Sequence, residues 1–232
     1  MIKAVFFDVG STLLYPNPDI DGVFYEVARG RGHSVSLEDA HAKLPEVNRF
    51  YEEEYLKDGD FWCSREGAVE MYLEMYRYLS RLMGLEEDEE PIAQEVYSRY
   101  LKPRYWRIID DVLPCLKELK GMRLRLGVVS NWSSNLPDLL RGLSLLPYFE
   151  EVVASAEVGY RKPSPVIFEL MLERMGVAPF EAVHVGDKPD ADGVGAQAAG
   201  ITPVIIDRQG GQPAGFICIR SLSELAGVVA RL

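Results

Sequence analysis

The sequence has little cysteine, little histidine and a shortage of positive charge. Its 232 residues include three cysteines and three histidines, and 25 lysines and arginines stand against 36 acidic residues, for a net charge of −11. The cysteines, at 63, 115 and 218, are odd in number and far apart, which favours reduced thiols over a disulfide framework or a zinc site. The acidic balance argues against nucleic acid or an anionic membrane as the main partner.

Long apolar runs and a secretory leader are also missing. No apolar run reaches the roughly 18 residues of a membrane span, and no basic start leads into an apolar stretch with a small-residue cleavage site. We therefore expect a cytoplasmic protein without membrane or nucleic-acid partners; its oligomeric state cannot be read from the sequence. Apolar residues make up 47 % of the chain, enough for one large domain or a core with an insertion.

The second half of the chain alternates between two apolar patterns. Strands are expected over 124–131, 151–155, 182–187 and 202–207, with a short edge strand at 216–219. Helices are expected over 109–120, 134–143, 164–175, 190–199 and 221–231. Mostly apolar strands that alternate with helices predict an α/β fold, a Rossmann-like parallel sheet covered on both faces.

Residues 16–103 have a different character. After a breaker cluster at 15–18, apolar and aromatic residues recur at helical spacing, as at Val69, Tyr72 and Tyr76, and no strand is indicated. We expect an all-helical domain of four or five helices, inserted after the first strand, so that 1–15 and 104–232 form the core. Its aromatic residues either pack internally or form a wall that faces a substrate.

Polar side chains follow three of the predicted strands. Asp8 ends an apolar run, Ser130 and Asn131 end a second, and Asp187 ends a third, while Lys162 stands just before a helix. The carboxyl ends of parallel strands form the ligand-binding edge of such sheets. An acid, a hydroxyl, a lysine and further acids there suit an anion together with a hard cation such as Mg²⁺. The alternative for the first run is a strand that merely ends in a turn.

Four short motifs in this order resemble those of the haloacid dehalogenase-like (HAD) hydrolase superfamily. The family patterns are D-x-D-x-T, a Ser or Thr that closes a strand, a Lys before a helix, and G-D-x-x-x-x-D. The matching residues are Asp8 to Thr12, Ser130 with Asn131, Lys162, and Gly186 and Asp187 with Asp192. The helical insertion resembles the family's cap of the type placed after the first motif.

The resemblance implies a phosphatase mechanism that uses Mg²⁺. Asp8 would be the nucleophile and form an aspartyl-phosphate that water hydrolyses. Mg²⁺, held by Asp8, the Gly10 carbonyl and Asp187, would offset the repulsion between carboxylate and phosphate. Lys162 would add positive charge. Asp192 would support the metal or pair with Lys162; the alternative is a helix-start carboxylate favoured by the helix dipole.

The resemblance also assigns the phosphate contacts. Ser130 and the backbone N–H groups of the first loop, around Ser11 and Thr12, would bind the phosphoryl oxygens together with Asn131 and Lys162. The substrate would be a small phosphorylated metabolite, either a phosphomonoester or an acyl phosphate.

The sequence departs from the family pattern at Gly10. The family's phosphatases have there a second Asp, which protonates the leaving oxygen, and such general acid–base catalysis contributes about 10²–10⁴-fold. Three interpretations follow: a phosphatase that is slow or uses another proton donor, carbon-centred or phosphonate chemistry, or a non-enzymatic anion-binding protein. Asp187 and Asp192 argue against dehalogenase chemistry, because the family's dehalogenases lack this pair of acids. Acyl and aryl phosphates need protonation least.

Overall fold

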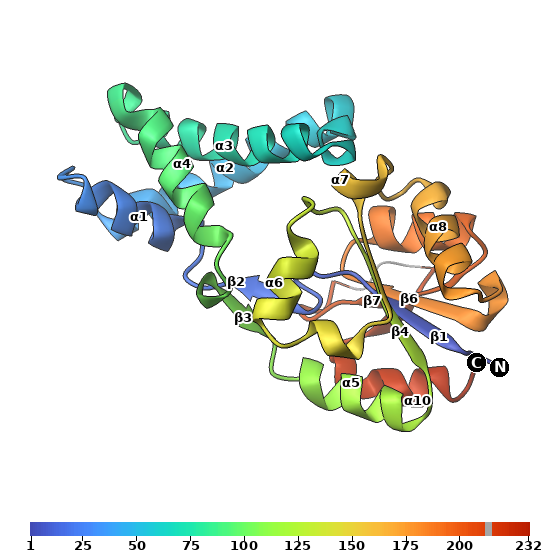
Figure 1. Cartoon of the computed structure of the whole chain (residues 1–232). Coiled ribbons are helices and arrows are strands. Elements are labelled where there is room, and N and C mark those ends of the chain that lie inside the picture. Colours follow the sequence, from blue (N-terminus) through green and yellow to red (C-terminus); the bar gives the residue numbers. More distant parts are fainter. Residues whose placement is uncertain (212–214) are drawn as a thin grey trace.

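A six-stranded sheet is the centre of the molecule (Figure 1). The computed structural model describes residues 1–211 and 215–232. The strand order is β5-β4-β1-β6-β7-β8 and every neighbouring pair is parallel. The strands are β1 (Ala4–Phe7), β4 (Arg125–Ser130), β5 (Glu151–Ala154), β6 (Ala182–Gly186), β7 (Thr202–Ile206) and β8 (Ile217–Ile219). Because β1 pairs with both β4 and β6, the residue that follows it lies at the middle of the sheet edge.

Helices cover both faces of this sheet, as the apolar pattern predicts. The α-helices of the core are α5 (Val112–Gly121), α6 (Leu136–Gly142), α7 (Ser155–Val158), α8 (Pro165–Met175), α9 (Gly195–Ala198) and α10 (Leu225–Val229). Val5 and Phe7 of β1 pack into the same cluster as residues of α5, α6 and α10. Ala4 and Phe6 point to the other face and pack with residues of α8 and α9. The predicted doubly covered α/β core is thus confirmed.

Four α-helices follow β1 in the sequence, before the chain returns to the core. In space they lie beyond the end of the sheet (Figure 1). They are α1 (Ile20–Gly30), α2 (Leu37–Asp58), α3 (Arg65–Leu82) and α4 (Glu89–Tyr100). Asp19 and Ser64 cap α1 and α3 by accepting hydrogen bonds from backbone N–H groups. These helices share an apolar cluster of their own, separate from the clusters around the sheet. A helical insertion after β1 is confirmed, while its division at 16–103 stays a prediction.

The chain enters and leaves these helices through a small antiparallel ribbon. β2 (Leu14–Pro16) pairs with β3 (Trp106–Ile108). The sequence pattern predicts a breaker cluster at residues 15–18 and neither of these strands, so the ribbon corrects that prediction. Pro16 is tolerated because it stands at the end of a two-stranded ribbon, where its missing N–H is not needed by a further strand.

Short 3₁₀ turns join several elements. Two of the expected helices also differ from the prediction. The 3₁₀ turns are η1 (Gly59–Cys63), η2 (Glu86–Asp88), η3 (Pro103–Tyr105), η4 (Leu146–Tyr148), η5 (Pro179–Glu181) and η7 (Leu222–Glu224). The helix expected over 190–199 is a π-helical segment, η6 (Pro189–Val194), followed by α9. The helix expected over 221–231 is η7 followed by α10. The π-helical turn coincides with the inward placement of Asp192, as such turns often do at functional sites.

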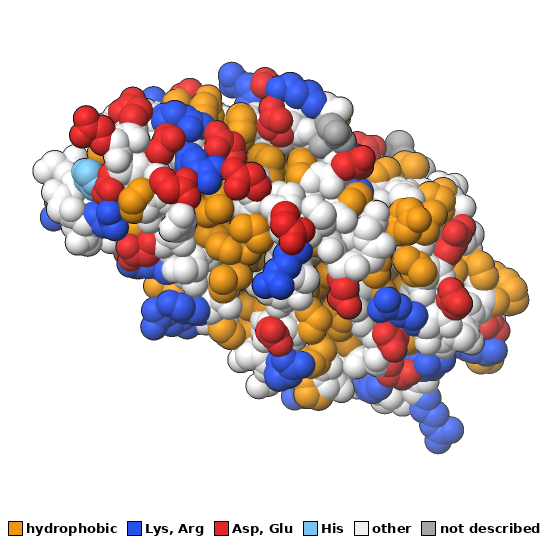
Figure 2. Space-filling model, turned by 45° about the horizontal axis from the view of Figure 1, so that its top comes forward, with side chains coloured by type: hydrophobic (Ala, Val, Ile, Leu, Met, Phe, Trp, Pro, Cys, Tyr) orange, Lys and Arg blue, Asp and Glu red, His pale blue; other side chains and the backbone are white. Residues whose placement is uncertain are grey.

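The surface carries charges of both signs. Figure 2 shows acidic and basic side chains interspersed on one face, with apolar surface between them. Among the described residues, no helix combines the length and the apolar character that crossing a bilayer requires.

Candidate active site

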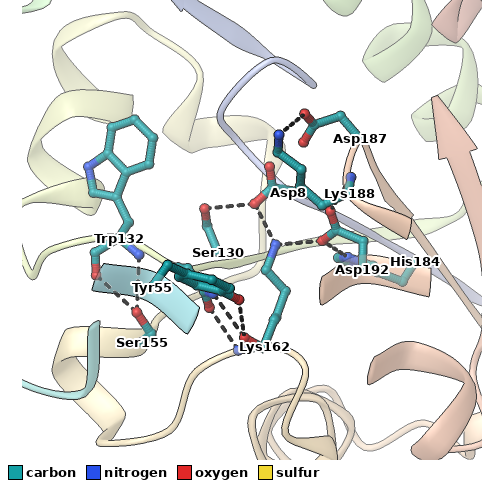
Figure 3. Close-up of polar contacts among 11 residues, drawn as sticks. Asp8, Tyr55, Ser130, Trp132, Ser155, Lys162, His184, Asp187, Lys188 and Asp192 are labelled. Carbon is teal, nitrogen blue, oxygen red and sulfur yellow. Dashed lines mark hydrogen bonds and ion pairs between the residues drawn. The ribbon is translucent and has the colours of Figure 1, made fainter. Parts of the chain in front are cut away.

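Asp8 lies at the middle of the carboxyl edge of the sheet, where β1 ends. Its N–H donates to the Val185 carbonyl of β6 over 2.8 Å, which extends the β1–β6 pairing by one residue. Ser130, the last residue of β4, donates its hydroxyl to Asp8 Oδ1 over 2.8 Å (Figure 3). The carboxylate is 7 % exposed, so it is held in place and still reachable. The two sheet neighbours of β1 therefore fix the side chain that sequence analysis singled out.

Lys162 is buried between two carboxylates. Its Nζ donates to Asp8 Oδ1 over 2.6 Å and to Asp192 Oδ1 over 2.5 Å (Figure 3). Burial opposes the charge, but the carboxylates of Asp192 and Asp8 outweigh it and raise the pKa of Lys162 above its ordinary value. A permanently charged ammonium group is thus fixed beside Asp8, where it can stabilise a bound anion.

The loop that carries Lys162 is held from two sides. Asn131 donates through Nδ2 to the Lys162 carbonyl over 3.0 Å, and its Oδ1 accepts from the Lys162 N–H over 2.8 Å. From α2, the Tyr55 hydroxyl donates to the same carbonyl over 3.3 Å. The Arg161 guanidinium lies 4.7 Å from the centre of the Tyr55 ring. The Asn131 side chain, predicted to bind phosphate, thus already bonds the backbone of Lys162.

Asp192 is fully buried, and both of its oxygens accept hydrogen bonds. Oδ1 accepts from Lys162 and from His184 Nε2, 2.9 Å away, and Oδ2 accepts from the Lys188 N–H over 3.0 Å. Despite burial, Lys162 and His184 hold the pKa of Asp192 far below its usual range. A Cβ at Gly186 would lie 2.1 Å from Asp192 Cγ, so only glycine permits this approach.

Asp8, Asp187 and Asp192 form an acidic cluster. Each offers a carboxylate oxygen, and these oxygens lie within 4.8 Å of one another. Burial, together with the charges of Asp8 and Asp192, raises the pKa of Asp187 to about 7. The Lys188 ammonium, 4.0 Å from Asp187, is exposed and compensates this charge poorly. A hard divalent cation with oxygen ligands fits such a donor set.

The loop after Asp8 contains the other predicted site residues. Ser11 has a φ of 57°, and its N–H donates to the Leu14 carbonyl over 2.9 Å. The Gly10 carbonyl, predicted to be a metal ligand, accepts from the Thr12 N–H over 2.6 Å. Thr12 is fully buried, and its hydroxyl has no hydrogen-bond partner among the described residues. The phosphate-binding roles assigned to Ser11, Thr12, Ser130 and Asn131 stay predictions.

Three residues around the site escaped the sequence analysis. His184 bonds Asp192, Tyr55 bonds the Lys162 loop, and Arg208 donates through Nη2 to the Thr12 carbonyl over 3.2 Å. Two of them had a signal in the sequence: His184 is a polar residue inside an otherwise apolar strand, and Arg208 stands just after β7. Tyr55 gave none, because its contact joins α2 to a loop more than a hundred positions later.

The fold and these side chains define an α/β protein with a buried, hydrogen-bonded carboxylate at the centre of its sheet edge. A family model described as haloacid dehalogenase-like hydrolase matches residues 2–200. The chain belongs to this family of hydrolases, as the resemblance of its motifs led us to expect.

Individual relatives agree with this assignment. The chain is 34 % identical over 218 residues to a glyceraldehyde 3-phosphate phosphatase of Methanopyrus kandleri, covering 90 % of this chain and 85 % of that protein. A solved HAD phosphatase of Thermococcus onnurineus is 29 % identical with a TM-score of 0.67, and 98 % of each chain is covered. A solved putative HAD-hydrolase of Bacillus subtilis shares the fold, with a TM-score of 0.79 and 22 % sequence identity. The comparison covers 98 % of each chain.

Proposed function

We propose that the protein is a Mg²⁺-dependent phosphatase that hydrolyses small phosphorylated molecules through an aspartyl-phosphate on Asp8. The observation that carries the proposal is the position of Asp8, which accepts hydrogen bonds from Ser130 and Lys162 and lies within the acidic cluster. The phosphatase names of similar proteins, among them a glyceraldehyde 3-phosphate phosphatase, support it. The cytoplasmic location and the metabolite partner stay predictions from the sequence.

The first chemical step is the attack of Asp8 on phosphorus. A carboxylate oxygen forms a bond to phosphorus, and the bond from phosphorus to the ester or acyl oxygen breaks, with its electron pair leaving on that oxygen. Lys162 and the Ser130 hydroxyl, both within hydrogen-bond distance of Asp8, orient the carboxylate and face the developing negative charge.

The second step restores the enzyme. Water attacks the phosphorus of the aspartyl-phosphate, the bond to the Asp8 oxygen breaks, and inorganic phosphate leaves while the water's proton passes to phosphate or solvent. Gly10 supplies no acid for the leaving oxygen, so the first step proceeds best when that oxygen is a stable anion without protonation.

The metal would be held by Asp8 and Asp187, with the Gly10 carbonyl as a third ligand. When bound, Mg²⁺ neutralises part of the phosphate charge and of the acidic cluster. Asp192, whose oxygens already accept from Lys162, His184 and the Lys188 N–H, fits a supporting role better than a direct ligand.

The test is the release of phosphate from acetyl phosphate and p-nitrophenyl phosphate, measured with Mg²⁺ and with EDTA. We expect release only with Mg²⁺, and a loss of at least about 10³-fold in Asp8→Asn. Asp190→Asn is the matched control, because Asp190 is exposed on the same segment as Asp192 and lies outside the cluster; it should retain activity. Turnover that survives EDTA or Asp8→Asn would contradict the mechanism.

A further inference from the structure

A cavity of about 100 Å³ lies between the helical insertion and the core, next to the loop that follows Ser130. It is lined by residues of β2, α1, α3, α4, β3 and the loop after β4. Aromatic rings form most of its wall: Tyr72, Tyr76, Tyr97, Tyr100, Trp106 and Trp132. None of the described residues that line it is charged.

Trp132 lines this cavity and lies beside the loop after Asp8. An added Cβ on Gly10, two residues after Asp8, would meet the Trp132 ring at 3.7 Å. The backbone N–H of Trp132 donates to the buried Ser155 hydroxyl over 3.1 Å. This hydroxyl donates in turn to the backbone carbonyl of Trp132 over 3.4 Å (Figure 3). The Trp132 backbone is therefore held in place, and its side chain lines the cavity beside Gly10.

The rings continue from Trp132 into the insertion. Trp106 lies 5.1 Å from Trp132 and 5.8 Å from Tyr100, and Tyr100 lies 6.3 Å from Tyr76, measured between ring centres. The Tyr100 hydroxyl donates to the Pro18 carbonyl, and Trp106 Nε1 donates to the Tyr100 carbonyl. The Tyr100 hydroxyl and the Trp106 N–H thus bond backbone acceptors. Burial raises the pKa of Tyr76 and of Tyr100, so both hydroxyls stay neutral.

Size and chemistry limit what such a cavity can bind. Its volume is about two thirds of the roughly 150 Å³ of an apolar cavity that binds benzene, so it has room for no more than about one ring. A chain of hydroxyl groups would lose its bonds to water against ring faces, and a second phosphate would need a cationic partner that the lining does not supply. A flat apolar group gains both burial and ring stacking.

We propose that this cavity holds a planar apolar leaving group of about one ring, so that the substrates are phosphate esters of the aryl type. The inference rests on the proposed phosphatase function and names its substrate class. Gly10 supports it independently, because an aryloxide is a stable enough anion to leave without a general acid, whereas a sugar alkoxide is not.

The test compares three phosphonates that cannot be hydrolysed, bound to the wild-type protein in Mg²⁺ and measured by titration calorimetry. Benzylphosphonate has the shape of phenyl phosphate, ethylphosphonate lacks the ring, and the phosphonate analogue of glycerol phosphate replaces it with hydroxyls. We expect benzylphosphonate to bind at least about tenfold more tightly than either. Equal affinities, or a preference for the hydroxylated analogue, would overturn the proposal.

A variant with a smaller cavity tests whether the ring of the ligand binds there. Leu101 lines the cavity at the end of α4 and is 41 % exposed, so Leu101→Trp should fold and reduce the space. We expect its preference for benzylphosphonate over ethylphosphonate to fall about fivefold or more. Leu37→Trp, at a leucine of α2 that is 46 % exposed and outside the lining, should keep the wild-type preference. An unchanged preference in Leu101→Trp would show that the ring binds elsewhere.

The binding and turnover experiments can fail separately. A ring preference without phosphate release would support the ligand class and overturn the phosphatase function. Phosphate release that depends on Asp8, without any ring preference, would keep the function and overturn the substrate class.

Discussion

Gly10 is the residue at which this chain differs most from the pattern it otherwise matches. Its backbone φ is not in the left-handed region, and the nearest atom to an added Cβ is an ordinary van der Waals contact with Trp132 at 3.7 Å. Neither backbone strain nor crowding at the Cβ demands glycine there. The absence of a carboxylate is therefore a feature of the chemistry rather than of the fold.

Gly10→Asp should supply the missing general acid. We expect kcat for alkyl phosphates to rise by at least about tenfold, which is a fraction of the roughly 10²–10⁴-fold that such catalysis can contribute, and kcat for aryl phosphates to change much less. Steady-state kinetics on glycerol phosphate and phenyl phosphate measure both.

Gly10→Asn is the matched control for this change. It adds a side chain of the same shape without a proton to give, so it should raise neither rate. An equal rise for both esters in Gly10→Asp would show that leaving-group protonation is not what limits turnover.

Two loops meet at the candidate site, and their contact explains how Lys162 is placed. The loop after β4 provides Asn131, whose amide satisfies both the N–H and the carbonyl of Lys162. This backbone is partly buried, so an unpaired group there carries a desolvation cost. The position of the ammonium group thus depends on a side chain from a different strand.

Asn131→Ala should loosen this arrangement. We expect a decrease of about 1–3 kcal/mol in the free energy of unfolding, because the Lys162 N–H loses its acceptor and the Lys162 carbonyl loses one of its donors. Activity should fall as well, since Lys162 is no longer held at Asp8. Urea denaturation and kcat measure the two effects.

Asn48→Ala serves as the comparison, because Asn48 is exposed on α2; it should change stability by less than about 0.5 kcal/mol. An Asn131→Ala protein with wild-type kcat would refute a positioning role for this amide.

Arg208 joins distant parts of the molecule next to the loop that follows Asp8. It donates to both oxygens of Asp111, over 2.8 and 3.0 Å, and its Nε and Nη2 reach the carbonyls of Ser11 and Thr12. Asp111 also accepts from the Ser221 hydroxyl. The first loop, the start of α5 and the C-terminal segment are thereby tied together by one ion pair.

This ion pair makes stability depend on pH. Burial would raise the pKa of Asp111, but the hydrogen bonds from Arg208, Ser221 and the Leu222 N–H outweigh it and lower the pKa below the ordinary value of 3.8. Ionised Asp111 therefore stabilises the folded state above pH 3.8, and this contribution is lost as the pH falls through the lower folded-state pKa.

Asp111→Asn should lower the free energy of unfolding by about 1–2 kcal/mol at neutral pH, and the difference from wild type should narrow below pH 3.8. Thermal unfolding as a function of pH measures it. Asp110→Asn is the matched control, since Asp110 is 84 % exposed and should have almost no effect. A difference that stayed constant down to acid pH would show that the charge of Asp111 is unimportant.

The layers of the fold and the order of the candidate site residues could be predicted from the sequence. Apolar strands such as Ala4–Phe7 are buried on both faces, so local pattern alone revealed them, and strand ends at Asp8, Ser130 and Asp187 had to meet at one edge of a parallel sheet. The short β2 and β3 were missed because three residues carry too little periodicity to be seen.

The contacts between these residues could not be predicted in this way, because they depend on how the chain packs. That Asp192 accepts from Lys162 and His184, that Tyr55 reaches the Lys162 loop, and that Trp132 stands beside Gly10 all depend on distances between segments far apart in the chain. Residue type and spacing along a strand or helix predict which way a side chain faces. They do not predict which remote side chain it meets, because that depends on how the helices pack against the sheet and against each other.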